Sequence, residues 1–295
     1  MGPIVSGIRK EWFMNYWLWF ASIEMLGSVK KQKLLEKYQS PENIYYLEKE
    51  KIMQISGIGE KIWNNINLSK DISKINKIQD FMNKHHIHQL NIDDEEYPKG
   101  LKNIYDPPIT LFYVGNIELL KNKCIAVVGS RAATEYGKNV AFHIANELSQ
   151  NDYTVVSGLA AGIDGAAHRG AVHNSNSTIA VIGSGLDYTY PIENYSLYGE
   201  IARKGLILTE YIVGTKPLSC NFPARNRIIS GISEGVIVVE ASKKSGSLIT
   251  VDFALEQGKN VYAVPGNINS FNSIGTNELM KDGAIPYTGI SDLLL

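Results

Sequence analysis

Apolar residues recur along this chain in two different patterns. Up to about residue 85 they lie three and four positions apart, with few glycines or prolines outside turns, and this spacing predicts helices. Beyond that point, short apolar runs alternate with segments long enough to form helices. The runs cover residues 124–129, 153–158, 178–183, 206–211, 235–240 and 260–265. Strands that are apolar on both faces and alternate with helices predict a mostly parallel sheet covered on both sides.

Two domains are therefore expected. A chain of 295 residues can bury one full-sized core and a smaller one. We predict a small all-α helical domain over residues 1–85 and, over residues 86–295, an extended α/β domain that is Rossmann-like and doubly wound. A proline-bearing connection that begins near residue 93 leads into its first short strand at residues 111–114.

Within the helical domain, the segment IMQISGIGEKIWNNI at residues 52–66 has the pattern of a helix-hairpin-helix. In such a motif, the backbone N–H groups at the start of the second helix can hold a phosphate. A plain pair of helices joined by a glycine turn has the same pattern. Both interpretations stay open.

The composition favours a cytoplasmic protein without a membrane partner. No apolar run approaches the roughly 18 residues of a membrane span, and the aromatic-rich stretch near the start is interrupted by Glu11, Asn15 and Glu24. The sequence also lacks the basic start and small-residue cleavage site of a signal peptide. Cys124 and Cys220 predict no disulfide in a reducing compartment and, without a histidine cluster, no zinc site. We expect neither a metal nor a cofactor.

The net charge of −1 hides an uneven distribution. Residues 211–233 and 241–251 contain no acidic residue, although each segment contains cations, and the local potential at a site matters more than the total charge. These cations are Lys216, Arg225, Arg227, Lys243 and Lys244. They indicate either an anion-binding surface or ordinary solvated loops.

Glycine and serine are concentrated where the predicted strands turn into helices. In open parallel sheets, ligands bind beyond the carboxyl ends of the strands. Small residues let an anion approach the backbone, and N–H groups and hydroxyls donate to its oxygens. Tight packing of helix on strand also needs glycine, but several such turns on one edge favour a phosphate-binding floor. The turns include Gly129, Ser130, Ser157, Gly158, Ser245, Gly246 and Ser247.

Common nucleotide-binding fingerprints are absent from these turns. The segment GSRAATEYG at residues 129–137 is not a GxGxxG motif, and the chain has no GxxxxGK[ST] motif, which disfavours a dehydrogenase or a P-loop ATPase. Arg131 instead stands in the first turn, where a guanidinium can grip a phosphate with two hydrogen bonds.

The segment NFPARNRIISG at residues 221–231 crowds an aromatic ring and two arginines into one turn. Phe222 can stack on a nucleobase, or it can anchor the loop in the core. Arg225 and Lys216 are expected to neutralise phosphates. Asn226 is expected to fix the loop or meet a base edge, and Arg227 to form an internal salt bridge.

The sequence supports a catalytic site less well than a binding site. Asp164 and His168 lie four residues apart, and Glu210 and Glu240 end strands, so an acid–base pair is conceivable. No Gly-x-Ser-x-Gly elbow or metal-ligand cluster accompanies them. We expect Asp164 to cap a helix or organise a loop, His168 to be a buried hydrogen-bonding group, and the protein to have no catalytic residue.

Five segments of the α/β domain resemble the DprA/Smf family of DNA-processing proteins, over about residues 95–288. They are IAVVGSRAATEYG, VVSGLAAGIDGAAHRGA, TIAVIGSGLDYTYP, FPARNRIISGISEGVIVVEASKKSGSLIT and VYAVPG. The resemblance implies a homodimer that binds and protects incoming single-stranded DNA. It also implies loading of RecA for recombination during natural transformation in competent cells, without catalytic turnover. The winged-helix tail of many relatives is missing after Leu295, so duplex contacts by such a tail are not expected.

The resemblance also assigns binding positions in three turns. These are Gly129, Ser130, Arg131, Lys216, Phe222, Arg225, Asn226, Lys244, Ser245, Gly246 and Ser247.

An alternative function is a Rossmann-like nucleotide-binding enzyme of the nucleoside monophosphate phosphoribohydrolase type. Its PGGxGTxxE turn is echoed faintly by Pro265, Gly266, Gly275, Thr276 and Glu278. Gly266 and Gly275 are too far apart in the sequence for the compact loop that such an enzyme needs. A protein adaptor that binds no nucleotide is a third possibility.

Overall fold

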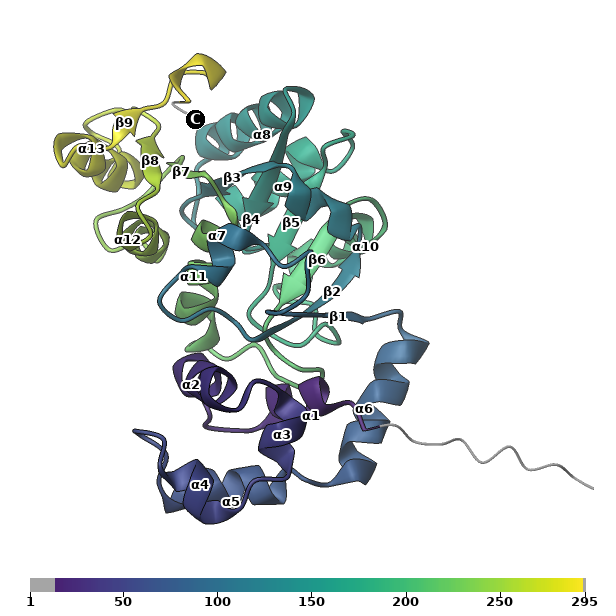
Figure 1. The fold of residues 1–295 in the computed structure, drawn as a ribbon. Helices are drawn as coiled ribbons and strands as arrows, with labels where there is room; N and C mark the ends of the chain where they lie inside the picture. Colours follow the sequence, from purple (N-terminus) through teal and green to yellow (C-terminus); the bar gives the residue numbers. More distant parts are fainter. Residues whose placement is uncertain (1–13, 294–295) are drawn as a thin grey trace, which may run out of the picture. The chain divides into compact units, whose positions relative to one another are not determined.

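A computed structural model describes residues 14–293 of the protein (Figure 1). The chain divides between His85 and His86 into two compact units, which we call the N-terminal and C-terminal units.

The N-terminal unit is helical, as the apolar spacing predicts. Its buried residues include Trp19, Phe20 and Leu34, which are fully buried. Asn15 begins the first helix by accepting a hydrogen bond from the Leu18 N–H at 2.9 Å. The helices are α1 Tyr16–Ser22, α2 Ser28–Tyr38, α3 Pro41–Tyr45, α4 Lys49–Met53, α5 Glu60–Leu68 and α6 Ile72–Lys84.

The glycine turn at residues 57–59 is flanked by α4 and α5, of which α4 has only five residues. Gly57 has a φ of +86°, a conformation that favours glycine. Glu60, in the first turn of α5, forms a 2.7 Å ion pair with Lys49. A carboxylate at this position already interacts with the helix dipole and weakens the attraction for a phosphate. Phosphate binding by this turn stays a prediction.

The C-terminal unit is built on one sheet with the strand order β1-β2-β6-β5-β4-β3-β7-β8-β9. The strands from β3 onwards pair in parallel, whereas β1 pairs with β2, and β2 with β6, in antiparallel fashion. The strands are β1 His88–Asn91, β2 Thr110–Gly115, β3 Lys123–Val128, β4 Tyr153–Ser157, β5 Thr178–Val181, β6 Leu206–Thr209, β7 Gly235–Val238, β8 Asn260–Ala263 and β9 Ile285–Pro286. The predicted mostly parallel sheet is confirmed.

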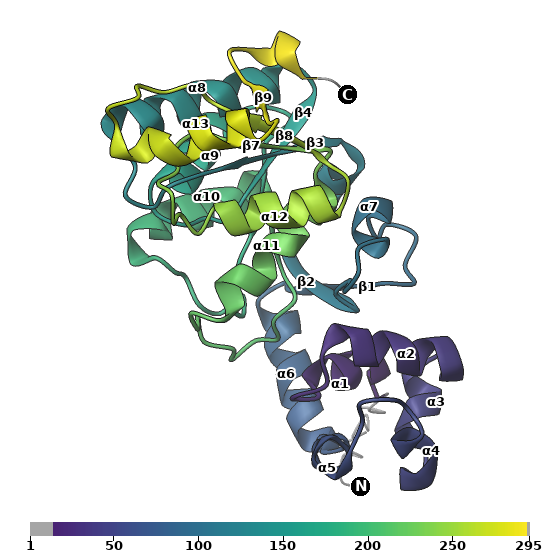
Figure 2. The same cartoon turned by 90° about the vertical axis from the view of Figure 1, so that its left-hand side faces the viewer.

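Helices cover both faces of this sheet (Figures 1 and 2). On one face α8 and α9 pack against each other and bury residues such as Ile125 and Val127 of β3. On the other face α11 packs against α12. The helices are α7 Lys99–Lys102, α8 Glu135–Gln150, α9 Ile163–Ala171, α10 Tyr195–Lys204, α11 Asn221–Ile232, α12 Leu248–Glu256 and α13 Ile274–Lys281, with short 3₁₀ segments η1 Ile117–Lys121, η2 Ile192–Asn194, η3 Phe271–Ser273 and η4 Ile290–Asp292.

The order of the strands determines where a ligand can enter. From β3 the chain continues to β4 on one side, whereas β7 pairs with β3 on the other side. The loops that follow β3 and β7 therefore diverge and leave a crevice at the carboxyl ends of these two strands. Open α/β sheets bind their ligands at such a topological switch point.

Candidate functional site

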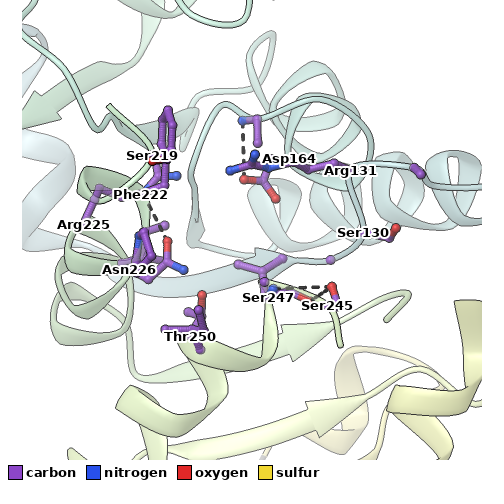
Figure 3. Close-up of a pocket in the computed structure, with 18 of the residues that line it drawn as sticks. Ser130, Arg131, Asp164, Ser219, Phe222, Arg225, Asn226, Ser245, Ser247 and Thr250 are labelled. Atoms are coloured by element: carbon purple, nitrogen blue, oxygen red, sulfur yellow. Dashed lines mark hydrogen bonds between the residues drawn. The ribbon is translucent and has the colours of Figure 1, made fainter. Parts of the chain in front are cut away.

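A cavity of about 540 Å³ lies at this switch point. Side chains from the turn after β3, the turn after β7 and the start of α11 line it (Figure 3). Most of the residues predicted from the sequence meet here. They are Gly129, Ser130, Arg131, Phe222, Arg225, Asn226, Ser245, Gly246 and Ser247.

The turn after β3 forms the first wall. The Ser130 N–H donates to the Glu240 carbonyl oxygen at 2.8 Å, and the Ser130 carbonyl oxygen accepts from the Ile163 N–H at 3.2 Å. Gly162 has a φ of +76°, and a Cβ at this residue would overlap the same carbonyl oxygen. These contacts hold the turn in place and leave the Arg131 side chain exposed to solvent.

The serine turn after β7 forms the second wall. The Ser245 and Ser247 hydroxyl oxygens are 2.8 Å apart, and the Ser247 N–H donates to Ser245 Oγ at 3.4 Å. Ser247 immediately precedes α12, and the Leu248 N–H donates to the Ser245 carbonyl oxygen at 3.1 Å, which ties the turn to the helix. Gly246 and Lys244 are exposed beside it. This wall offers hydroxyl and N–H donors next to a cation.

The third wall is the start of α11, which the sequence analysis treated as a loop. The rings of Phe222 and Tyr190 stack with centroids 5.4 Å apart, and Arg131 Cζ lies 5.1 Å from the Phe222 centroid. Phe222 is half-buried, whereas Tyr190 is 48% exposed. Phe222 thus anchors a stack whose more accessible ring belongs to Tyr190. Tyr190 was not predicted as a site residue from the sequence.

The Arg225 side chain is not placed to bind phosphate, in contrast to the prediction from the sequence. Its side chain is only 3% exposed, and Nη1 donates to the Gly158 carbonyl oxygen at 2.7 Å and to the Val181 carbonyl oxygen. Its Nε donates to Asn226 Oδ1 at 3.2 Å, which fixes the Asn226 side chain. Burial lowers the pKa of Arg225 to about 10. Because these donors are engaged, Arg225 supports the floor of the cavity and does not reach solvent to neutralise a phosphate.

Asp164 lies beside Arg225 and organises the loop after β4, as predicted. Its Oδ2 accepts from the Gly158 N–H at 3.1 Å and from the Ala160 N–H at 3.4 Å. Burial raises the pKa of Asp164, and the neighbouring Arg225 charge opposes that shift. A buried carboxylate and a buried guanidinium therefore compensate each other beneath the cavity.

His168 is a buried hydrogen-bonding group, which confirms its predicted role. Thr178 Oγ1 donates to the Val155 carbonyl oxygen at 2.7 Å, so His168 Nδ1 donates to Thr178 Oγ1, also at 2.7 Å. The Leu159 N–H then donates to Nε2 at 3.3 Å. Burial lowers the pKa of His168 from 6.5 to about 3, and the ring is neutral at pH 7.

This shift predicts that His168 makes the protein sensitive to mild acid. In the unfolded chain the ring takes up a proton below pH 6.5, whereas in the folded chain it stays neutral down to about pH 3. The stability contributed by the neutral ring is therefore lost as the pH falls from 6.5. Between pH 7.5 and 5.5, wild type should lose about 1.4 kcal/mol more than a His168→Gln variant. Urea unfolding at the two pH values measures this difference.

The buried Ser149 provides the control for this measurement. A Ser149→Ala variant should keep the wild-type pH dependence, because it removes a buried hydroxyl that donates to the Ala145 carbonyl oxygen at 2.8 Å and changes no titratable side chain. Equal pH dependence in wild type and His168→Gln would contradict the assignment of a neutral, buried imidazole.

The other predicted site residues lie outside the main cavity. Ser157 is fully buried and its hydroxyl donates to the Val127 carbonyl oxygen at 2.7 Å, so it supports the sheet and cannot join a phosphate-binding floor. Gly158 lines a smaller adjoining cavity. Lys216 and Lys244 are exposed on the loops whose neighbouring residues line the main cavity.

Carboxylates at two strand ends have structural partners. Arg227 forms ion pairs with Glu210 at 2.7 Å and Asp106 at 2.9 Å, which confirms its predicted internal salt bridge. The Glu240 carboxylate accepts from the Thr134 N–H at 2.9 Å and from its hydroxyl at 2.5 Å, and so holds the start of α8. Neither carboxylate lines the main cavity.

The segment that carries the glycines of the alternative enzyme hypothesis also lies outside the main cavity. Of the residues that line the main cavity, none comes from residues 265–278. Glu278, which would be the acidic residue of that turn, forms an ion pair with Lys243 at 3.3 Å.

Residues 14–293 contain no group of three or more histidine, cysteine, aspartate or glutamate side chains placed to hold a metal ion. Within the same residues, no helix combines the length and apolar character that crossing a membrane requires.

Comparison with known proteins identifies the family. The model of the family described as DNA recombination-mediator protein A matches residues 88–295. DNA processing protein DprA of Streptococcus pneumoniae is 48% identical over 205 residues, which are 70% of this chain and 72% of that protein. Protein Smf of Synechocystis sp. is 36% identical over 278 residues, which are 91% of this chain and 69% of that protein.

Solved structures agree with the sequence comparison. The X-ray structure of DprA from Streptococcus pneumoniae has a TM-score of 0.85 at 39% identity and covers 96% of this chain and 97% of that chain. A structure of DprA from Helicobacter pylori, which describes its single-stranded DNA binding mode, has a TM-score of 0.63 at 34% identity and covers 70% of this chain and 93% of that chain. The chain therefore belongs to the DNA recombination-mediator protein A family.

Proposed function

We propose that this protein has a DNA-processing role of the DprA type and binds single-stranded DNA in the cavity between β3 and β7. The observation that carries the proposal is the meeting of three kinds of group at one open site. These are the exposed Arg131 cation, the Tyr190–Phe222 ring stack and the serine turn at residues 245–247. Cations next to aromatic rings are typical of sites for unpaired strands. The single-stranded DNA binding mode of the Helicobacter pylori relative supports the same conclusion.

The mechanism combines phosphate contacts with stacking. Phosphates lie against the turn at residues 129–131 and against the serine turn, where N–H groups, hydroxyls, Arg131 and Lys244 attract them. A base stacks on the exposed face of Tyr190, which Phe222 supports. Asp164 and Arg225 keep the floor rigid. Because stacking uses the ring face that every base has, we expect little sequence preference.

The wider cellular role belongs to the same proposal. The protein would act as a homodimer, protect incoming single strands and load RecA on them, by binding and without catalytic turnover. Membership of the family supports these points. The engagement of Asp164, His168 and Glu240 by structural hydrogen bonds also favours binding over catalysis.

A salt series tests the proposal directly. We expect fluorescence anisotropy to give tighter binding of oligothymidine than of a duplex of the same length. The logarithm of the association constant should fall linearly with the logarithm of the salt concentration, with a slope of about −0.7 for each phosphate neutralised. Equal affinity for both forms, or no dependence on salt, would count against it. Release of free base from nucleoside monophosphates would favour the alternative enzyme instead.

A further inference from the structure

A second cavity, of about 560 Å³, opens on the side of the C-terminal unit where α8 and α9 pack against each other. We call it the α8–α9 groove. Its lining includes Lys138 and Phe142 of α8 and Arg169 of α9, together with Arg131 from the turn after β3. The function proposed above does not use it, apart from Arg131.

The chemistry of the groove suits an anionic polymer with flat rings. Three cations line it, Arg131, Lys138 and Arg169, against the single carboxylate of Glu193. Phe142 is 40% exposed and presents an aromatic ring in the same groove. An exposed ring among cations is the combination that binds unpaired nucleotides.

Two of these cations already have partners, and both contacts are compatible with a ligand. Arg169 Nη2 donates to Asn194 Oδ1 at 3.2 Å, which orients the guanidinium along the groove wall. Lys138 forms a 2.7 Å ion pair with Glu135, whose side chain is 85% exposed. An exposed ion pair contributes little stability, so a phosphate can compete for the lysine.

The groove adjoins the main cavity. Arg131 and Ala132 line both, so the turn after β3 is the shared boundary between them. A polynucleotide that leaves the main cavity past Arg131 meets the groove next, and its phosphates find cations on both sides of that boundary. A mononucleotide is too short to contact the cations on both sides of this boundary, whereas a polynucleotide can.

We propose that the α8–α9 groove is a second subsite, which holds the continuation of the single strand beyond Arg131. A base of this second segment stacks on Phe142, and Arg169 and Lys138 contact its phosphates. This inference rests on the proposed function of the main cavity.

Oligothymidines of two lengths test the second subsite. We use about 5 and about 15 nucleotides, near the two ends of the site sizes known for single-strand-binding folds. Arg169→Gln and Phe142→Leu should each weaken binding of the longer strand by about fivefold or more, as expected for one lost contact. Both variants should bind the shorter strand like wild type. Phe142→Leu keeps an apolar side chain in place and limits any loss of packing.

Matched controls separate the second subsite from general effects. Arg203→Gln removes an exposed cation from α10, and Tyr105→Leu removes an exposed ring that is 86% accessible, both outside the groove. These variants should bind both lengths like wild type. Unchanged binding of the longer strand by both groove variants would overturn the subsite, and so would equal weakening of both lengths. If wild type binds neither length, the proposed function itself fails.

Discussion

Replacing Arg131 by alanine should weaken the binding of single-stranded DNA at least about tenfold, because a hydrogen bond to a charged group contributes about 1.5–3 kcal/mol. Arg131 is the cation at the boundary of the two cavities, is exposed to solvent and lies 5.1 Å from the Phe222 ring centroid. Its loss removes a phosphate contact and the cation from the ring stack. The slope of the logarithm of the association constant against the logarithm of the salt concentration should become less negative by about 0.7. Anisotropy titrations across a salt series measure both effects.

Two further variants separate the effect of the Arg131 side chain from the effect of losing any exposed cation. Arg131→Lys keeps the charge but loses the planar, two-pronged donor, so it should retain the salt slope and recover only part of the affinity. Arg203→Ala removes an exposed cation from α10 and should leave both quantities unchanged. Wild-type affinity and slope in Arg131→Ala would show that the strand does not pass this turn.

The second large effect concerns stability. Arg225→Met should reduce the free energy of unfolding by about 2–6 kcal/mol, because each of two buried carbonyl oxygens left without a donor costs about 1–3 kcal/mol. The substitution leaves the Gly158 and Val181 carbonyl oxygens without their donor and Asp164 without its compensating charge. Urea unfolding monitored by circular dichroism measures the loss.

A double variant distinguishes this structural role from direct contact with DNA. Asp164→Asn removes the buried carboxylate charge, so combining it with Arg225→Met should cost less than the sum of the two single substitutions. If Arg225→Met instead keeps wild-type stability and loses affinity for DNA, Arg225 is a phosphate ligand, as the sequence pattern suggested.

The sheet could be predicted because its signal is local. Runs such as residues 124–129 and 235–240 are apolar on both faces, and only a strand covered on two sides accommodates them. The edge strands β1 and β9 were missed. His88–Asn91 is polar and short, and Ile285–Pro286 has only two residues, so neither carries a periodic pattern.

The site could be predicted only in part because some of its contacts are not local. Exposed turn residues such as Arg131 follow directly from their position after a strand. The partners of Arg225 are carbonyl groups on β5 and after β4, and they become visible only once the strand order is known. Tyr190 becomes a site residue because its loop packs on Phe222, 32 positions later in the chain, and residue type alone does not reveal such a contact.

Photo-crosslinking of an oligothymidine that carries 4-thiothymidine, followed by peptide mass spectrometry, tests the central claim most directly. The account predicts crosslinks to Tyr190 and to the peptides that contain residues 129–131 and 245–247, which line the cavity between β3 and β7. Crosslinks confined to other surfaces, with these three segments unmodified, would contradict it.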